Sequence, residues 1–220
     1  MPKPAASRHK RPTPERAREI YDRLAEHYPD AKCALHYRTP YQLLVATILS
    51  AQCTDKRVNM VTPALFKRYR TPAAMADANP EELEEMIKST GFFRNKTKSL
   101  LGMSRALVER HGGRVPEQLD ALVKLPGVGR KTANVVLGNA FDVNEGVVVD
   151  THVTRLSQRL GFTRQTDPVR IEQDLMRLFP TERWTMLAHL LIEHGRRICD
   201  ARKPKCESCF LNDVCPSSRV

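Results

Sequence analysis

The sequence predicts an all-α protein, on three grounds. A capping residue followed directly by proline is a typical helix start, because its side chain accepts a first-turn N–H and proline suits the first helical position. Such pairs are Thr13-Pro14, Thr39-Pro40, Thr71-Pro72, Asn79-Pro80 and Asp167-Pro168. Apolar residues recur at helical spacing in several segments, whereas a β-branched strand signal is confined to the short segment Gly146–Val149.

The first half of the chain contains a candidate central helix. Tyr41–Leu49 is apolar on every side, so this helix is expected to be buried on all faces. Thr62-Pro63 either starts a further helix or breaks a helix opened by Asp55. Glu81–Thr90 is predicted to form a helix that Gly91 ends.

The second half adds further helices. Asp120–Lys124 and Thr132–Leu137 are predicted to be helical on either side of a glycine-containing turn. Arg183–Arg197 forms another amphipathic segment, with Trp184 expected in the core. No repeat of 20 to 50 residues and no low-complexity tract divides the 220 residues. A compact helical protein follows.

The charge balance indicates a polyanionic partner. The formal net charge is +11 and the isoelectric point is about 9.6. Nucleic acid and an anionic membrane surface would both suit such a chain. A basic amphipathic helix with aromatic anchors is not found, and the longest apolar run, Leu43–Leu49, is too short to span a bilayer. Nucleic acid is therefore favoured and no membrane association is expected.

The first residues, about 1–12, are expected to form a disordered basic arm. They carry Lys3, Arg8, Lys10 and Arg11, with no acidic residue before Glu15. No apolar stretch follows these cations, so the segment is not a secretory signal.

A glycine turn is the most informative segment. It lies within Leu125–Ala133, where Gly127 and Gly129 are separated by one residue and allow a tight hairpin with positive φ. The helix that follows begins with unpaired N–H groups, which form a natural phosphate site. A phosphate-binding P-loop is excluded because Arg130 separates Gly129 from Lys131, and a dinucleotide fingerprint lacks its third glycine at Thr132. The alternative is an ordinary corner between two helices.

Four of the six cysteines crowd into the last 22 residues. Cys199, Cys206, Cys209 and Cys215 have the spacing C-x6-C-x2-C-x5-C, which suits either zinc or a [4Fe–4S] cluster. The two remaining ones, Cys33 and Cys53, are expected to be buried packing residues. His189 and His194 stand five residues apart and do not share a helix face, so the H-E-x-x-H zinc pattern does not apply.

These motifs together resemble the endonuclease III family of DNA glycosylases, over roughly Ile20 to Cys215. In its bifunctional members the hairpin ends in a nucleophilic lysine, which falls on Lys131. The family's Val-Asp-Thr-His box matches 149–152 and places the catalytic aspartate at Asp150, 19 residues later. A helix N-terminus, the adjacent Arg130 and partial burial are each expected to favour the neutral amine that attacks the sugar. Asp150 would then stabilise the positive sugar or relay protons.

The resemblance also assigns the cysteines and the DNA contacts. The family's C-terminal motif has the same cysteine spacing and binds a [4Fe–4S] cluster, while the loop between its first two ligands rests on DNA phosphates. Gln52 matches the glutamine that fills the space left by an extruded base, and Phe92 stands where family members often have a wedging leucine. Phe93 is expected to be the more buried of the two phenylalanines. The remaining expected DNA-binding residues are Gly127, Val128, Gly129, Arg130, Thr132, Arg202, Lys203 and Lys205.

Two helical domains with a DNA cleft between them are implied by the resemblance. An iron–sulfur cluster domain would comprise 1–32 and 144–220, and a six-helix domain with the helix-hairpin-helix would comprise 33–143. The implied enzyme removes oxidised pyrimidines from duplex DNA and then nicks the strand by β-elimination. We expect a monomer that acts on damaged bases and abasic sites at the nucleoid of a bacterial cytoplasm, without magnesium.

Two other functions are compatible with parts of the sequence. A monofunctional glycosylase of the adenine-removing branch would lack lysine at position 131 and would carry a further C-terminal domain. A noncatalytic module would use the hairpin only to grip phosphates, and loss of Lys131 would then weaken binding slightly. The presence of Asp150 beside the cysteine motif favours an enzyme over such a module.

Overall fold

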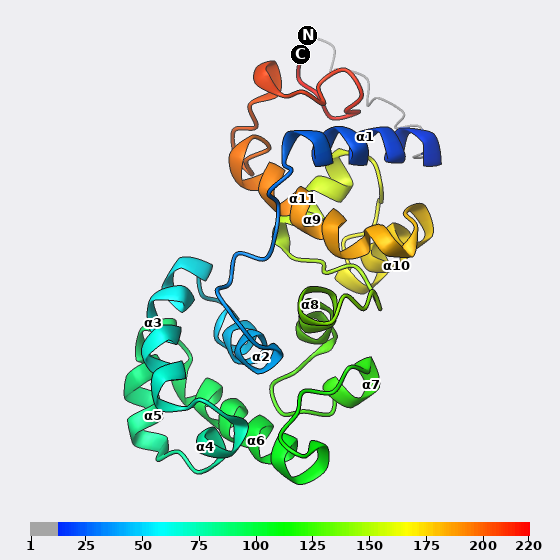
Figure 1. Ribbon diagram of the computed structural model, residues 1–220. Coiled ribbons are helices and arrows are strands. Elements are labelled where there is room, and N and C mark those ends of the chain that lie inside the picture. Colours follow the sequence, from blue (N-terminus) through cyan, green and yellow to red (C-terminus); the bar gives the residue numbers. More distant parts are fainter. Residues whose placement is uncertain (1–12) are drawn as a thin grey trace. The chain divides into compact units, whose positions relative to one another are not determined.

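The computed structural model describes residues 13–220, which form two compact units. One unit is Cys33–Glu145, and the other combines the chain up to Lys32 with Gly146–Val220. The expected basic arm at 1–12 lies outside the described residues. Every regular element of the described chain is a helix and none is a strand (Figure 1), so the predicted all-α fold is confirmed.

Seven α-helices and one 3₁₀ helix make up the unit Cys33–Glu145. They are α2 (Pro40–Leu49), α3 (Asp55–Arg68), α4 (Pro72–Ala76), α5 (Pro80–Ile87), η1 (Lys88–Thr90), α6 (Phe93–His111), α7 (Leu119–Leu122) and α8 (Arg130–Ala140). The capping side chains of Thr39, Thr71 and Asn79 each accept a first-turn N–H at 2.8–3.2 Å, as predicted. Gly91, with φ of 72°, follows η1 and separates it from α6.

The core of this unit is built around α2. All but two of its ten residues are buried, and the helix packs against α3, α6 and α8. This confirms the expectation of a buried central helix. It also fixes the loop that follows α2, because that loop leaves from a helix held on every side.

Pro63 was expected to start or to break a helix, and both alternatives are wrong. The helix α3 runs from Asp55 to Arg68 and contains Pro63 in its interior, with Thr54 as its N-cap. The pyrrolidine ring removes one backbone hydrogen bond, which ordinarily destabilises a helix. Here Pro63 is exposed, so water can reach the carbonyl that loses its partner, while Val58, Thr62 and Leu65 hold the helix to the core.

The second unit contains four α-helices and two short 3₁₀ helices. They are α1 (Pro14–His27), α9 (Thr151–Arg159), α10 (Pro168–Leu178), η2 (Thr181–Arg183), α11 (Trp184–Arg197) and η3 (Cys206–Ser208). Thr13 and Asp167 cap α1 and α10 as predicted. α11 packs against both α1 and α9, and Ile20, Leu24 and Leu191 are fully buried.

Trp184 differs from its expected place in the core, because it is only half-buried. Its indole N–H donates to the carbonyl of Phe179 at 2.8 Å, so the ring lies at the start of α11 where that carbonyl is accessible. The β-branched residues Val147, Val148 and Val149 are buried but form an extended segment without a strand partner in the described chain.

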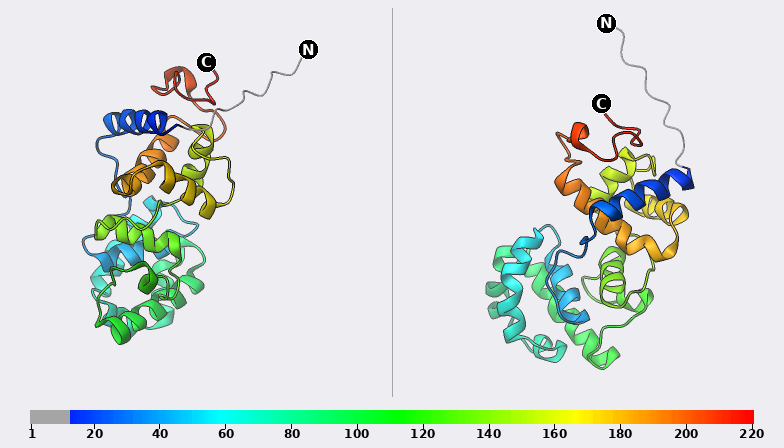
Figure 2. Two further views of the ribbon diagram at one scale, coloured as in Figure 1. Left: turned by 90° about the vertical axis from the view of Figure 1, so that its right-hand side faces the viewer. Right: turned by 45° about the horizontal axis from the view of Figure 1, so that its top comes forward.

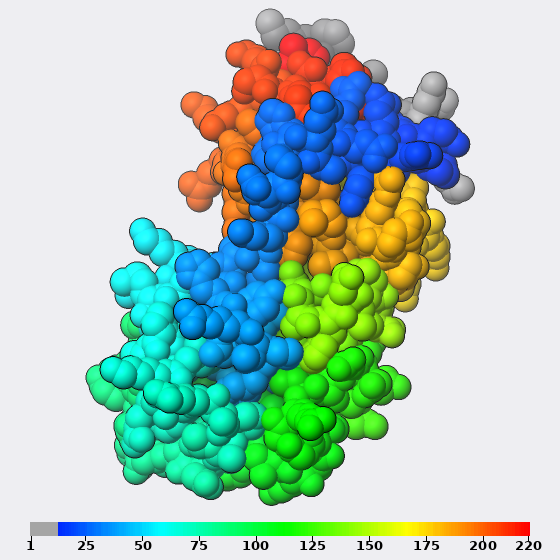
Figure 3. Space-filling model, viewed as in Figure 1, coloured from blue at the N-terminus to red at the C-terminus, as the bar shows by residue number. Residues whose placement is uncertain are grey.

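The C-terminal segment of this unit closes against its N-terminal helix, as the views in Figure 2 and the surface in Figure 3 show. The Arg23 guanidinium binds the Asp213 carboxylate at 2.8 Å and the carbonyl of Phe210 at 3.2 Å. The rings of His27 and Phe210 stack with their centroids 4.0 Å apart. Residues almost two hundred positions apart in sequence therefore form one packed layer. None of the helices within 13–220 has the length and apolar character needed to cross a bilayer.

Candidate functional site

The glycine turn forms a hairpin between α7 and α8. Leu125 and Val128 are buried on its inner side. Gly127 has φ of +76°, and a Cβ at this position would lie 2.5 Å from the Cβ of Ser99, so only glycine fits. Gly129 has φ of −91° and ψ of 174°, which is extended backbone. The expected positive φ is therefore present at the first glycine and absent at the second.

The N-terminus of α8 leaves its first-turn amides without a side-chain cap. Gly129 is its N-cap and has no side chain to occupy the first-turn amides. Arg130 and Lys131 are the first two helical residues, and both are exposed. The Arg130 guanidinium donates to the carbonyl of Glu145 at 3.3 Å. Thr132 is half-buried on the next position of the turn.

One expectation for the hairpin needs correction. Lys131 was expected to be partly buried, but its side chain is exposed, because the buried residues of α8 begin only at Ala133. Val128 was expected to bind DNA, and its side chain is only 5% exposed. Its isopropyl group fills the core and its backbone N–H donates to the carbonyl of Leu125 at 3.1 Å, so the DNA contact expected of Val128 stays a prediction.

Asp150 is the N-cap of α9. Its Oδ1 accepts the N–H of Val153 at 2.8 Å, and the residue is half-buried. This capping role of Asp150 was not predicted from the sequence. His152 lies in the first turn, with its Nδ1 3.1 Å from a guanidinium nitrogen of Arg155. Burial lowers the pKa of His152 below its usual value, although the Asp150 carboxylate acts to raise it. The lowered pKa agrees with the expectation of a packed, hydrogen-bonded histidine.

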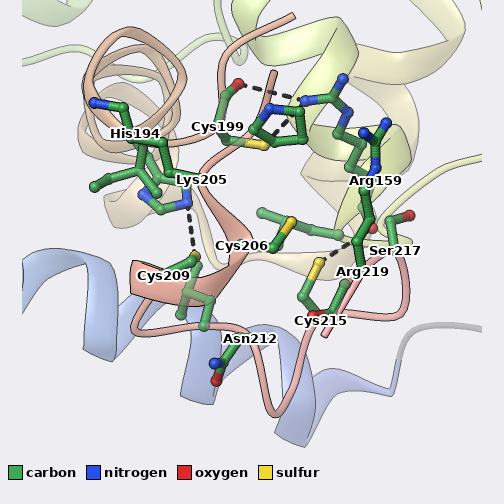
Figure 4. A pocket seen from close by; sticks show the side chains of 15 residues that line it. Arg159, His194, Cys199, Lys205, Cys206, Cys209, Asn212, Cys215, Ser217 and Arg219 are labelled. Atoms are coloured by element: carbon green, nitrogen blue, oxygen red, sulfur yellow. Dashed lines mark hydrogen bonds between the residues drawn. The ribbon is translucent and has the colours of Figure 1, made fainter. Parts of the chain in front are cut away.

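The four clustered cysteines line one cavity of about 270 Å³. Cys199 follows α11, Cys206 begins η3, and Cys209 and Cys215 follow it, so that their sulfur atoms turn toward a common space (Figure 4). A single water-sized ion needs only about 10–15 Å³. The donor set and the size of the cavity therefore fit a multi-atom, thiolate-bound group.

Two basic side chains approach these sulfur atoms. An Arg159 nitrogen lies 3.3 Å from the Sγ of Cys199, and His194 Nε2 lies 3.6 Å from the Sγ of Cys209 (Figure 4). The other ring nitrogen of His194 is 2.9 Å from the Tyr28 hydroxyl. If Tyr28 donates to Nδ1, then Nε2 carries the proton and donates to the sulfur.

Burial also shapes the chemistry around the cavity. It raises the pKa of the Cys209 and Cys215 thiols and lowers the pKa of His194 to about 4. His194 is therefore a neutral hydrogen-bonding group near pH 7. Neither Arg159 nor His194 was identified from the sequence, because their proximity to the cysteines arises only from the packing of α9 and α11.

The loop between the first two cysteines presents three exposed cations, as expected. Arg202 and Lys203 donate their backbone N–H groups to Asp200 Oδ1 at 2.9 and 3.2 Å. Lys205 donates its ammonium to the carbonyl of Arg197 at 3.2 Å. The backbone of this loop is thus fixed by Asp200, while its basic side chains face solvent.

Gln52 and Phe92 share an unusual backbone conformation. Both are exposed, and their φ values are 52° and 47°, in the left-handed region. Phe92 is 61% exposed, whereas Phe93 is half-buried against the core, which confirms the expected difference between the two rings. Cys33 and Cys53 also pack against that core but are half-buried rather than fully buried.

Comparison with known proteins matches both motif regions. Residues 45–181 match the HhH-GPD superfamily of base excision DNA repair proteins, and residues 199–215 match the iron–sulfur binding domain of endonuclease III. The chain is 57% identical to endonuclease III of Synechocystis sp., over 94% of each chain. It is 42% identical to endonuclease III of Escherichia coli, over 90% of this chain and 93% of that one.

Solved structures give the same result. The chain resembles a non-covalent endonuclease III–DNA complex with a TM-score of 0.89 and 45% identity, covering 94% of this chain and 97% of the other. It resembles a trapped endonuclease III–DNA covalent intermediate with the same TM-score, identity and coverage.

Proposed function

The chain belongs to the endonuclease III family of base excision DNA repair proteins, and from this premise we propose which of its residues carry out the reaction. It is a DNA glycosylase and abasic-site lyase that binds damaged DNA and contains an iron–sulfur cluster. We propose that it removes oxidised pyrimidines from duplex DNA through a Schiff base at Lys131, then nicks the strand by β-elimination.

The observation that carries this proposal is the position of Lys131. Its exposed amine stands in the first turn of α8, next to amides that suit a DNA phosphate. In the reaction the neutral amine forms a bond to the sugar C1′ as the glycosidic bond breaks, and the base leaves with a proton. The sugar ring then opens as the C1′–O4′ bond breaks, the electron pair and a proton pass to O4′, and a protonated imine joins C1′ to the lysine nitrogen. This imine allows loss of a C2′ proton and departure of the 3′ phosphate.

Asp150 is proposed as the second catalytic residue. Its Oδ1 is fixed by the Val153 amide, so the carboxylate has a defined orientation at the N-terminus of α9. A carboxylate held in this way stabilises positive charge on a sugar without having to reorganise. It also provides an acceptor for a proton that leaves during the reaction.

The DNA contacts in our proposal fall into three groups. The first is the backbone of the hairpin at Gly127, Val128 and Gly129, with the side chains of Arg130 and Thr132. The second is Gln52 and Phe92, which enter the base stack when the damaged base is extruded. The third is the basic loop of Arg202, Lys203 and Lys205, which lies against phosphates.

The cluster has a structural role in this scheme. Cys199, Cys206, Cys209 and Cys215 would hold the [4Fe–4S] cluster, whose thiolate bonds tie the segment after α11 into one loop. The basic residues between the first two cysteines are thereby kept at the surface. Residues 144–220 with the N-terminal 32 residues would form the cluster domain, and 33–143 the hairpin domain.

We further propose that the enzyme acts as a monomer on chromosomal DNA in the cytoplasm. Four reduced, clustered cysteines suit a reducing compartment. The net charge of +11 favours association with nucleic acid before any specific contact forms.

Borohydride trapping on duplex DNA with one thymine glycol tests the role of Lys131. The wild type should form a covalent adduct, and Lys131→Gln should form none while retaining its fold, because the side chain is exposed. Lys124→Gln, at an exposed lysine beside the same hairpin, is the matched control and should trap normally. Base release without an adduct would indicate a monofunctional glycosylase. Binding without turnover on this lesion, other lesions or abasic sites would indicate a noncatalytic module.

A further inference from the structure

Lys96 carries a charge in the core of the unit Cys33–Glu145. It is 5% exposed, and every other charged residue that the structure describes in this unit lies nearer the surface. Burial lowers its pKa, as desolvation of an ammonium should. No carboxylate forms an ion pair with it among the described residues, so its retention in the core requires another explanation.

Its partners are two backbone carbonyls at helix C-termini. The Nζ donates to the carbonyl of Leu49 at 2.7 Å and to that of Thr90 at 2.9 Å. Leu49 is the last residue of α2, and Thr90 is the last residue of η1. Final carbonyls have no donor within their own helix and carry the negative end of its dipole. One ammonium therefore satisfies both ends, which offsets the cost of burying it.

Each of these helix ends leads directly into one of the exposed left-handed residues. Gln52 is three residues beyond Leu49, and Phe92 is two residues beyond Thr90. A non-glycine residue with positive φ costs on the order of 1–3 kcal/mol and persists only where its surroundings hold it. The Lys96 ammonium holds the backbone two and three residues before them, and the backbone N–H of Lys96 donates to the carbonyl of Phe92 at 3.1 Å.

We propose that Lys96 is a positioning residue that couples the Gln52 and Phe92 loops, so that both side chains enter the duplex as one unit during base extrusion. This inference rests on the DNA-contact roles proposed above. Lys96 touches neither the DNA nor the reacting atoms. Its effect should therefore appear when a paired base must be unstacked, and should be small when the base is already unpaired.

The test compares one lesion in two settings. Lys96→Met keeps the length of the side chain but removes the donor. Single-turnover base release from a fully paired thymine glycol duplex should fall about tenfold or more, because unstacking a base requires a few kcal/mol. Release of the same lesion from a short mismatched bubble should fall by less than about threefold. Lys98→Met, at an exposed lysine on the same helix, should change neither rate. Equal losses on both DNAs, or no loss, would overturn the proposal.

Two further measurements keep this result separate from the chemistry and from the fold. Fluorescence of a 2-aminopurine placed beside the lesion reports extrusion without bond cleavage, and can be read in a Lys131→Gln background. Failure of wild-type trapping would refute the Lys131 chemistry, yet a Lys96 effect on this signal would remain measurable. If Lys96→Met does not fold, a double-mutant cycle of Gln52→Ala and Phe92→Ala decides the question. Non-additivity of at least about threefold is expected, and additive effects would refute the coupling.

Discussion

Replacing Asp150 should separate its capping role from its catalytic role. The carboxylate accepts the Val153 amide at 2.8 Å as the N-cap of α9, and we propose that it also stabilises charge on the sugar. Asparagine caps a helix about as well as aspartate, whereas alanine does not cap it. Asp150→Asn therefore removes the charge and keeps the cap, while Asp150→Ala removes both.

The magnitudes follow from these two roles. Loss of an N-cap costs about 1 kcal/mol, within a range of roughly 0.5–2 kcal/mol. For a chain of this size that corresponds to about 2–4 °C in the unfolding midpoint. A positioned acid or base contributes about 10²–10⁴-fold to rate. Asp150→Asn should thus lose at least about a hundredfold in base release with an unchanged midpoint. Asp150→Ala should lose as much activity and also melt about 2–4 °C lower.

The matched control is Asp167, which caps α10 in the same unit by accepting the Arg170 amide at 3.0 Å. Asp167→Ala should lower the midpoint by about 2–4 °C and leave base release unchanged. The assays are single-turnover base release and thermal unfolding followed by circular dichroism, with cluster content checked by visible absorbance. A nearly wild-type rate in Asp150→Asn would show that the carboxylate serves only as a cap. If the unfolding midpoint of Asp150→Asn were as low as that of Asp150→Ala, the capping argument would be refuted.

Three further predictions concern the hairpin, the pH dependence and the cluster. Gly127→Ala should destabilise the protein by about 1–3 kcal/mol, because φ is positive there and the new Cβ would lie 2.5 Å from the Cβ of Ser99. Gly129→Ala meets no atom within 4 Å and should cost less than about 1 kcal/mol. Chemical denaturation measures both changes. Burial lowers the pKa of His189 from 6.5, so the unfolded chain binds a proton at this residue more readily than the folded protein does. The free energy of unfolding should therefore fall as the pH drops below 6.5. In urea titrations, His189→Gln should make the free energy of unfolding depend less steeply on pH. Oxidative removal of the cluster should increase hydrogen exchange in 199–215 but not in the core of Cys33–Glu145; equal increases in both would contradict this.

Local signals in the sequence were enough to predict where five of the helices begin. The five capping pairs all lie at helix N-termini, because a cap is satisfied within four residues and does not depend on tertiary packing. Pro63 shows where such reasoning ends. Its local cost inside α3 is outweighed by the buried contacts of that helix, which no short window of sequence reveals.

The candidate site divides in the same way. The hairpin, the cysteine spacing and the Asp150 box are contiguous motifs, and the sequence identified each of them. Lys96 and His194 could not be identified, because their partners are far away in the sequence. Lys96 binds the carbonyl of Leu49, 47 residues away, and His194 contacts the hydroxyl of Tyr28, 166 residues away. A lysine in the first turn of a helix ordinarily lies at the surface, and only the coordinates show that this one is buried.

The packing of α1 against the C-terminal segment affects how the protein is made on the ribosome. The unit Cys33–Glu145 is continuous in sequence and can fold as soon as it has been synthesised. α1 is synthesised earlier, but its partners α11 and Asp213 are among the later residues to emerge. Its apolar face therefore lacks these partners until the C-terminal segment has been synthesised. Docking of this first helix is thus one of the last steps of folding.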